Sequence, residues 1–156
     1  MSEPVAPVSR RGFLAGATAL GAPAPAVPAV AQQHASKGVV VLIDSNEPRV
    51  MGHAISYTAN LSKHFASKGQ TAPIEIVANS QGIDVFRADK SPLKEPLAAL
   101  RQMFPTVVLS MCASSKSIAE SKENLIIPLV EGARLVPFGI GRVVELQMKG
   151  WAYVHG

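Results

Sequence analysis

GVVVLID, residues 38–44, is the stretch of this 156-residue chain that decides the fold. It is a short, continuous apolar run, and most of it is β-branched valine and isoleucine. β-branched residues favour extended backbone, and a run without polar alternation is typical of a strand that is buried on both faces. The sequence therefore predicts a parallel sheet that is covered on both sides.

Short strand-like runs and helix-like segments alternate along the rest of the chain. Residues 48–68, for example, carry apolar side chains at helical spacing from Met51 to Phe65, and Gly69 ends them. Such alternation predicts a three-layer, flavodoxin-like α/β domain with a mainly parallel, five-stranded sheet and right-handed crossovers. The expected strands are 38–44, 73–78, 106–111, 134–137 and 151–154, and the expected helical segments are 48–68, 83–88, 91–104, 114–121 and 139–149.

The composition excludes several classes of protein. Hydrophobic residues make up 47% of the chain and charged residues 17%, which is enough apolar material for a core and excludes wholesale disorder. Aromatic residues make up 5%, and the basic residues are scattered without a run, so no nucleic-acid partner is expected. The single cysteine, Cys112, excludes an internal disulfide and any site built from several cysteines.

Neither a cofactor nor a metal site is expected within one chain. Gly139-Ile140-Gly141 precedes a predicted helix, but it lacks the length of a G-x-G-x-x-G motif and the lysine of a P-loop. His53 and His64 are about 16 Å apart along a helix, so one metal ion cannot bridge them. A soft-metal site through Cys112 would need ligands from another subunit.

The first 31 residues have the three parts of an export signal. Arg10 and Arg11 precede an uncharged apolar segment, and Ala29-Val30-Ala31 supplies the small residues of an A-x-A cleavage site. The paired arginines in S-R-R-x-F-L resemble a twin-arginine (Tat) signal. Prolines in the apolar segment make it a poor membrane-spanning helix, so no stable membrane insertion is expected after the signal is removed.

This signal sets the expected organisation and location of the protein. Tat substrates cross the membrane already folded, so we expect a domain that folds in the cytoplasm and resides in the periplasm. The predicted segments are a cleaved Tat signal peptide at 1–31, a flexible mature N-terminus at 32–37 and an α/β domain at 38–156.

The carboxyl ends of the predicted strands gather polar residues and the cysteine. In an open α/β sheet, ligands bind beyond these ends. Cys112 follows the third predicted strand and precedes a predicted helix, where unpaired N–H groups and the helix dipole favour an anion such as a thiolate. Two interpretations stay open, a reactive thiolate and a small buried side chain that only packs. The residues expected to form this edge are Asn46, Asn79, Ser80, Ala113, Ser114, Ser115 and Lys116.

Four stretches resemble the DsrE/DsrF-like family of sulfur-relay proteins. They are the opening valine-rich strand, the segment from Ile74 to Gly82, the strand that ends in Met111-Cys112-Ala113, and the close from Val136 to Val154, which contains P-x-G and L-Q-x-x-G-W-x-Y. The resemblance extends over nearly all of the predicted domain. It implies a homo-oligomeric α/β fold, and it implies that Cys112 matches the sulfur-binding cysteine of the family.

Two functions of different classes follow. The first is a periplasmic sulfur carrier whose Cys112 thiolate accepts sulfane sulfur as a persulfide, stabilised by N–H groups near Ala113–Ser115. Because the chain has no second cysteine, a donor or acceptor protein or a small thiol must complete the exchange. Whether this carrier also turns over as a sulfurtransferase enzyme is left open. The alternative is a non-catalytic ligand-binding or assembly subunit in which Cys112 is packed.

Overall fold

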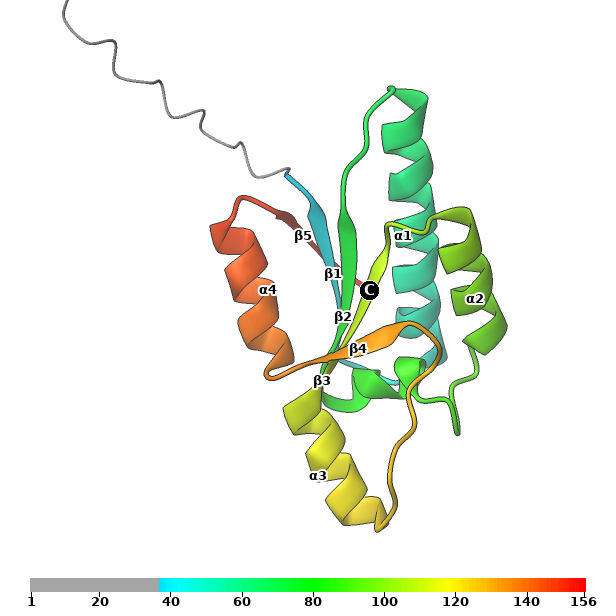
Figure 1. Ribbon diagram of the computed structural model, residues 1–156, viewed down its shortest axis with the longest axis vertical. Helices are drawn as coiled ribbons and strands as arrows, with labels where there is room; N and C mark the ends of the chain where they lie inside the picture. The colour runs from blue at the N-terminus through cyan, green and yellow to red at the C-terminus, as the bar shows by residue number, and fades with distance from the viewer. Residues whose placement is uncertain (1–36) are drawn as a thin grey trace, which may run out of the picture. The chain divides into compact units, whose positions relative to one another are not determined.

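Five strands alternate with helices along residues 37–156, the part of the chain that the computed structural model describes (Figure 1). The signal peptide predicted at 1–31 and residues 32–36 of the predicted flexible segment lie outside the described residues. The elements are β1 (Val39–Ile43), α1 (Pro48–Ser67), β2 (Ile74–Ala78), the 3₁₀ helix η1 (Ser80–Phe86), α2 (Lys94–Met103), β3 (Val108–Cys112), α3 (Ala113–Glu123), β4 (Ala133–Val136), α4 (Gly139–Met148) and β5 (Ala152–His155).

The strands form one sheet in the order β4-β3-β2-β1-β5. Every pair of neighbouring strands is parallel, so the predicted α/β class and five-stranded sheet are confirmed, and the sheet is wholly parallel. β1 lies between β2 and β5, which explains why its sequence is apolar throughout. Because all strands run the same way, their carboxyl ends meet at one edge of the sheet.

Helices cover both faces of the sheet, as the continuous apolar strands predict (Figure 1). Alternate residues of β1 point to opposite faces. Val39, Val41 and Ile43 pack in the larger core with residues of α1, η1 and α2. Val40 and Leu42 pack in a smaller core with α4. Full burial of such side chains stabilises the fold by about 1.5–3 kcal/mol each, so both cores contribute.

The cores on the two faces differ in size. The α4 core consists of Val40, Leu42, Val77, Val143 and Leu146, with Trp151 packed against it. Farther across this face, toward β4, two buried side chains are polar, because Glu75 and Ser110 take places where apolar residues are usual. None of the helices within residues 37–156 is both long enough and apolar enough to cross a bilayer.

Two boundaries differ from the sequence prediction in ways that affect the site. β3 extends through Cys112 and α3 begins at Ala113, so the cysteine is the residue at the strand–helix junction itself. η1 begins at Ser80, with Asn79 alone between it and β2, where the sequence predicted a turn before a short helical piece. Ser80 has a positive φ of 51°, a conformation that apolar periodicity does not report.

Candidate functional site

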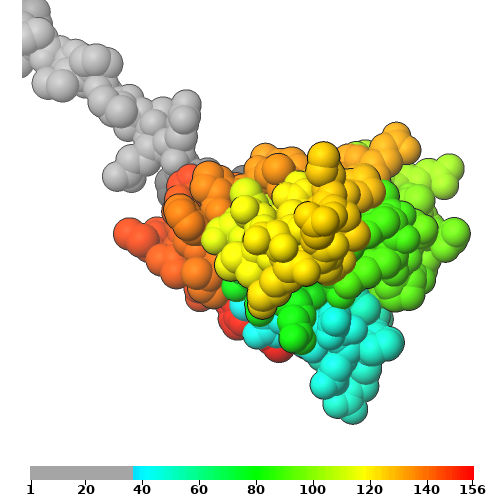
Figure 2. Space-filling model, turned by 90° about the horizontal axis from the view of Figure 1, so that it is seen from below, coloured from blue at the N-terminus to red at the C-terminus, as the bar shows by residue number. Residues whose placement is uncertain are grey.

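Cys112 lies at the point of the sheet where the chain changes face. After β3 the chain enters α3, which contacts η1 and, through Ala119, the larger core. After the neighbouring β4 it enters α4, on the opposite face. Such a reversal between adjacent strands leaves a crevice beyond their carboxyl ends, which is the usual ligand site of an open α/β sheet. Figure 2 shows the molecule from this end, with α3 in yellow at the front.

The sulfur of Cys112 lies beside the starts of two helices, α3 and α4. Cys112 is the N-cap of α3, and the backbone N–H of Ser115 donates to its Sγ at 3.4 Å. Burial raises the pKa of the Cys112 thiol. The Ser115 hydroxyl and the backbone N–H groups of Gly139, Ser115 and Ser114 together lower it by more than burial raises it, so the pKa lies below its ordinary value. The arrangement therefore favours a thiolate.

Asn79 and Ser115 form a hydrogen-bonded pair beside this sulfur. The Ser115 hydroxyl donates to Asn79 Oδ1 at 3.0 Å, and the same Ser115 oxygen accepts the backbone N–H of Ser80, also at 3.0 Å. A hydroxyl has one hydrogen to donate, so Ser115 either keeps Asn79 as its acceptor or turns toward the Cys112 sulfur. Ser115 thus links the thiol to the carboxyl end of β2.

Gly139 brings α4 against the same group. A Cβ atom at this position would lie 3.0 Å from Cys112 Cβ and 3.2 Å from Asn79 Cβ, closer than ordinary contacts allow. The missing side chain lets the first turn of α4 approach the thiol. Nothing in the local sequence pattern signals this role, because Gly139 is brought to Cys112 by the fold.

We expect Gly139→Ala to lower the free energy of unfolding by about 1–3 kcal/mol, because the new methyl group overpacks the Cys112–Asn79 contact. The matched control is Gly52→Ala in α1, where an added Cβ meets nothing within 4 Å. That substitution should stabilise the protein by about 0.4–1 kcal/mol, since alanine favours a helix. Urea denaturation of both variants measures the difference. Equal stability of Gly139→Ala and wild type would show that the close packing at Gly139 is absent.

A cavity of about 630 Å³ adjoins the thiol through Asn79 and Ser115. Cys112 is buried, with 3% of its surface exposed, and it is not among the residues that line this cavity. Four of the residues predicted at the ligand edge do line it, namely Asn46, Asn79, Ser80 and Ser115. The other lining residues are Gln81, Ile83, Asp84, Lys90, Ile118, Ala119, Lys122 and Glu123.

The remaining predicted edge residues lie at the start of α3. Ala113 and Ser114 form its first turn, and the Ser114 N–H donates to Pro137 O at 3.3 Å in addition to facing the sulfur. The Lys116 ammonium group forms an ion pair with Glu120, one turn farther along the helix. No group of three or more histidine, cysteine, aspartate or glutamate side chains within residues 37–156 is arranged to hold a metal ion.

Arg87 fixes the outer wall of the large cavity. This side chain is 1% exposed and makes paired hydrogen bonds to Asp89 and to Glu123, the latter at 2.7 and 2.8 Å. Hydrogen bonds to both carboxylates outweigh its burial and raise the pKa of Arg87, so it stays charged. The pairing ties the end of η1 to the end of α3 and holds the two walls of the cavity together.

The solved structures that are similar to this chain include the following two. MTH1491 from Methanobacterium thermoautotrophicum, described as a protein of unknown function, has 28% sequence identity and a TM-score of 0.65, over 77% of this chain and 99% of that one. The ychN protein from E. coli has 9% identity and a TM-score of 0.56, over 76% of this chain and 97% of that one. Both similarities fit a DsrE-like fold.

The structural similarity extends over almost the whole length of both solved chains. At 9% identity, the similarity to the ychN protein concerns the fold alone. No protein family model and no curated protein matches the sequence. Any statement on the chemistry of this protein therefore has to be argued from the geometry around Cys112.

Proposed function

We propose that this protein is a DsrE-type sulfur carrier, in which Cys112 holds sulfane sulfur as a persulfide. The observation that carries the proposal is the position of this sulfur at the starts of two helices, where the Ser115 N–H of α3 donates to it and Gly139 lets the first turn of α4 approach it. A persulfide anion has the same charge as a thiolate and gains from the same donors and helix dipoles. The fold similarity is compatible with a sulfur-relay role.

The proposed reaction is an exchange between sulfur atoms that needs no oxidant. The Cys112 thiolate attacks the outer sulfur of a donor persulfide, and the donor leaves as its thiolate while Cys112 becomes the persulfide. Return to the resting state is the reverse step with an acceptor thiol. Since Cys112 is the only cysteine of the chain, both the donor and the acceptor must be other molecules, either a partner protein or a small thiol.

The burial of Cys112 sets a condition on this exchange. With 3% of the residue exposed, a donor sulfur reaches Sγ only after a local opening. Asn79 and Ser115 are the residues shared by the thiol environment and the 630 Å³ cavity, so we propose that their contact opens to admit the donor. The same burial supports the competing function, a binding subunit in which Cys112 only packs.

Alkylation of Cys112 as a function of pH distinguishes these two functions. Ser115→Ala removes a donor to the thiolate, so the titration midpoint should move to higher pH and the rate near neutral pH should fall by roughly tenfold, since hydrogen bonds to charged groups contribute about 1.5–3 kcal/mol. Ser114→Ala is the matched control, because it keeps the backbone N–H and should leave the midpoint unchanged. A wild-type thiol that reacts only after unfolding would favour the packed subunit.

We also propose that the protein is exported by the Tat pathway to the periplasm and acts as a homo-oligomer. The S-R-R-x-F-L motif and the Ala29-Val30-Ala31 site support export. The outer side of α4 supports assembly, since Ile140, Val144 and Met148 are half or more exposed at helical spacing. Native mass spectrometry of protein from a periplasmic fraction reports cleavage, subunit number and any sulfur on Cys112 in one measurement.

A further inference from the structure

A buried carboxylate interrupts the apolar pattern of β2. Glu75 is 1% exposed, although its neighbours along the strand, Ile74, Ile76 and Val77, are apolar core residues. Its side chain lies on the α4 face, where the Ser110 hydroxyl donates to Glu75 Oε1 at 2.7 Å. A buried charge is retained only when it is well paired, and on balance such pairs add little to stability. The position of Glu75 therefore calls for a role other than stability.

Glu75 positions two guanidinium groups that come from different elements. Arg142 of α4 donates Nε to Oε1 at 2.9 Å and Nη2 to Oε2 at 2.8 Å, a bidentate pair. Arg134 of β4 donates Nη2 to Oε1 at 3.2 Å and Nε to the Ser110 oxygen at 3.1 Å. Burial raises the pKa of Glu75, but the hydrogen bonds from Arg142, Ser110 and Arg134 lower it below its ordinary value, so Glu75 stays ionised.

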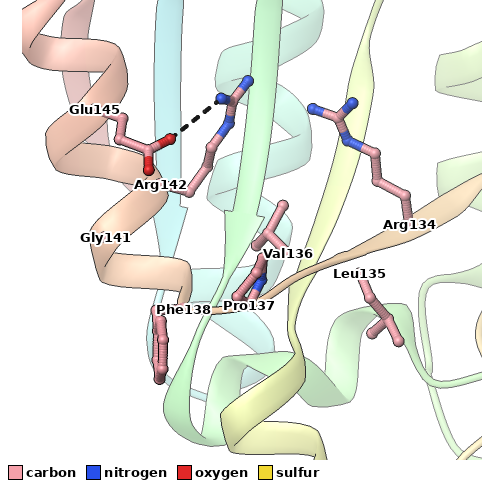
Figure 3. A pocket seen from close by; sticks show the side chains of 8 residues that line it. All are labelled: Arg134, Leu135, Val136, Pro137, Phe138, Gly141, Arg142 and Glu145. Carbon is pink, nitrogen blue, oxygen red and sulfur yellow. Dashed lines mark ion pairs between the residues drawn. The ribbon is translucent and has the colours of Figure 1, made fainter.

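Both guanidinium groups line an open cavity of about 320 Å³ beside α4 (Figure 3). Leu135 and Phe138, which are 48% and 66% exposed, are also among its lining residues, but their side chains point away from the two guanidinium groups in Figure 3. Gly141 adds the first turn of α4, the positive end of that helix dipole. The complete lining is Arg134, Leu135, Val136, Pro137, Phe138, Gly141, Arg142 and Glu145.

The Nη1 atoms of the two arginines make few contacts with the described part of the protein. Within residues 37–156, Arg134 Nη1 has no hydrogen-bond or ion-pair partner, and Arg142 Nη1 has only a 3.5 Å contact with Glu145 Oε2. The Glu145 side chain is 65% exposed, so water screens this contact strongly. The dashed line in Figure 3 marks this contact.

We infer that this cavity is a binding site for one oxyanion group, either a small inorganic oxyanion or the carboxylate of an organic molecule. The guanidinium fork suits planar or tetrahedral oxygen anions, and Glu75 holds two such forks in fixed orientation before a ligand arrives. The inference does not rest on the proposed function. A Cys112→Ser variant, which cannot form a persulfide, keeps both arginines and the cavity and should bind the oxyanion as wild type does.

The site is tested by titrating the protein with sodium sulfate and, separately, with sodium acetate, at an ionic strength held constant with chloride. The arginine Nε–H resonances are followed by NMR. Arg134→Gln should weaken binding by roughly tenfold or more, because it removes a charge-assisted donor. Glu145→Gln should tighten binding severalfold, since it removes a competing carboxylate. Arg49→Gln, an exposed change in the first turn of α1, should leave it unchanged.

Each outcome of this titration decides something about the site. Saturation with sulfate alone identifies an inorganic oxyanion, and saturation with acetate alone identifies a carboxylate. A linear, unsaturable response in both series overturns the inference. So does a response that is the same in the Arg134→Gln, Glu145→Gln and wild-type proteins.

Discussion

Replacing Cys112 by serine will abolish the gain of one sulfur atom that we expect when the protein is incubated with polysulfide under native conditions. The wild-type protein should gain that sulfur in its intact mass and lose it again when a reducing thiol is added, because a persulfide is exchanged by thiolates. The loss in the variant should be complete, since no other cysteine in the chain can take up the atom.

The control for this result is the Ser114→Ala variant, which keeps Cys112 and the backbone donors around it and should load like wild type. Retention of the added mass in Cys112→Ser would show that the sulfur is bound elsewhere and would end the carrier proposal. The proposal also fails if the wild-type protein gains no sulfur until it is unfolded. In that case Cys112 has a packing role and the protein belongs to the binding-subunit class.

Replacing Glu75 by glutamine is expected to lower the free energy of unfolding by about 3 kcal/mol, the low end of what removal of one partner of a buried ion pair costs. The amide keeps the volume, but it removes the charge that Arg142 and Arg134 share. The low end applies because both guanidinium groups are partly exposed and regain water. Urea denaturation measures the loss, and Glu145→Gln, on a 65% exposed side chain, should change stability by less than about 0.5 kcal/mol.

The pH dependence of stability provides a second test of the ion pairs that Glu75 makes with Arg142 and Arg134. The pKa of Glu75 is lowered from its ordinary value of 4.5, so the unfolded chain takes up this proton first as the pH falls. The contribution of Glu75 is therefore complete above pH 4.5 and is lost as the pH falls through the lower pKa of the folded state. The stability difference between wild type and Glu75→Gln should shrink over that range. A difference that stays constant down to the acid limit would mean that Glu75 is not held ionised.

The strand pattern and the sheet edge could be predicted because they depend on local sequence. The apolar run of β1 indicates a central parallel strand, and the rule for open sheets places the ends of β2 and β3 together. Asn79 and Ser115 follow these two strands and are far apart in the chain, yet their side chains are joined by a hydrogen bond, as the rule implies. The Lys116–Glu120 pair follows the i, i+4 spacing of a helix and was open to the same reasoning.

The contacts made by α4 could not be predicted, because they depend on where a crossover places a helix. Gly139 reaches Cys112 only because α4 packs on the face opposite α3. Glu75 is separated from Arg134 by 59 residues and from Arg142 by 67, and periodicity carries no information over such distances. A glutamate inside an otherwise apolar strand was the one signal available, and it marks a buried polar group without naming its partners.

The position of β1 between β2 and β5 has a consequence for the order of folding. β2 follows β1 closely in the chain, but β5, at residues 152–155, forms its other neighbour across more than a hundred residues. During synthesis, β1 therefore keeps one row of unpaired peptide groups until nearly all of the chain has left the ribosome. Long-range parallel pairing of this kind is slow and exposes such a row to aggregation. For the proposed Tat export, this last pairing has to be completed in the cytoplasm, before translocation.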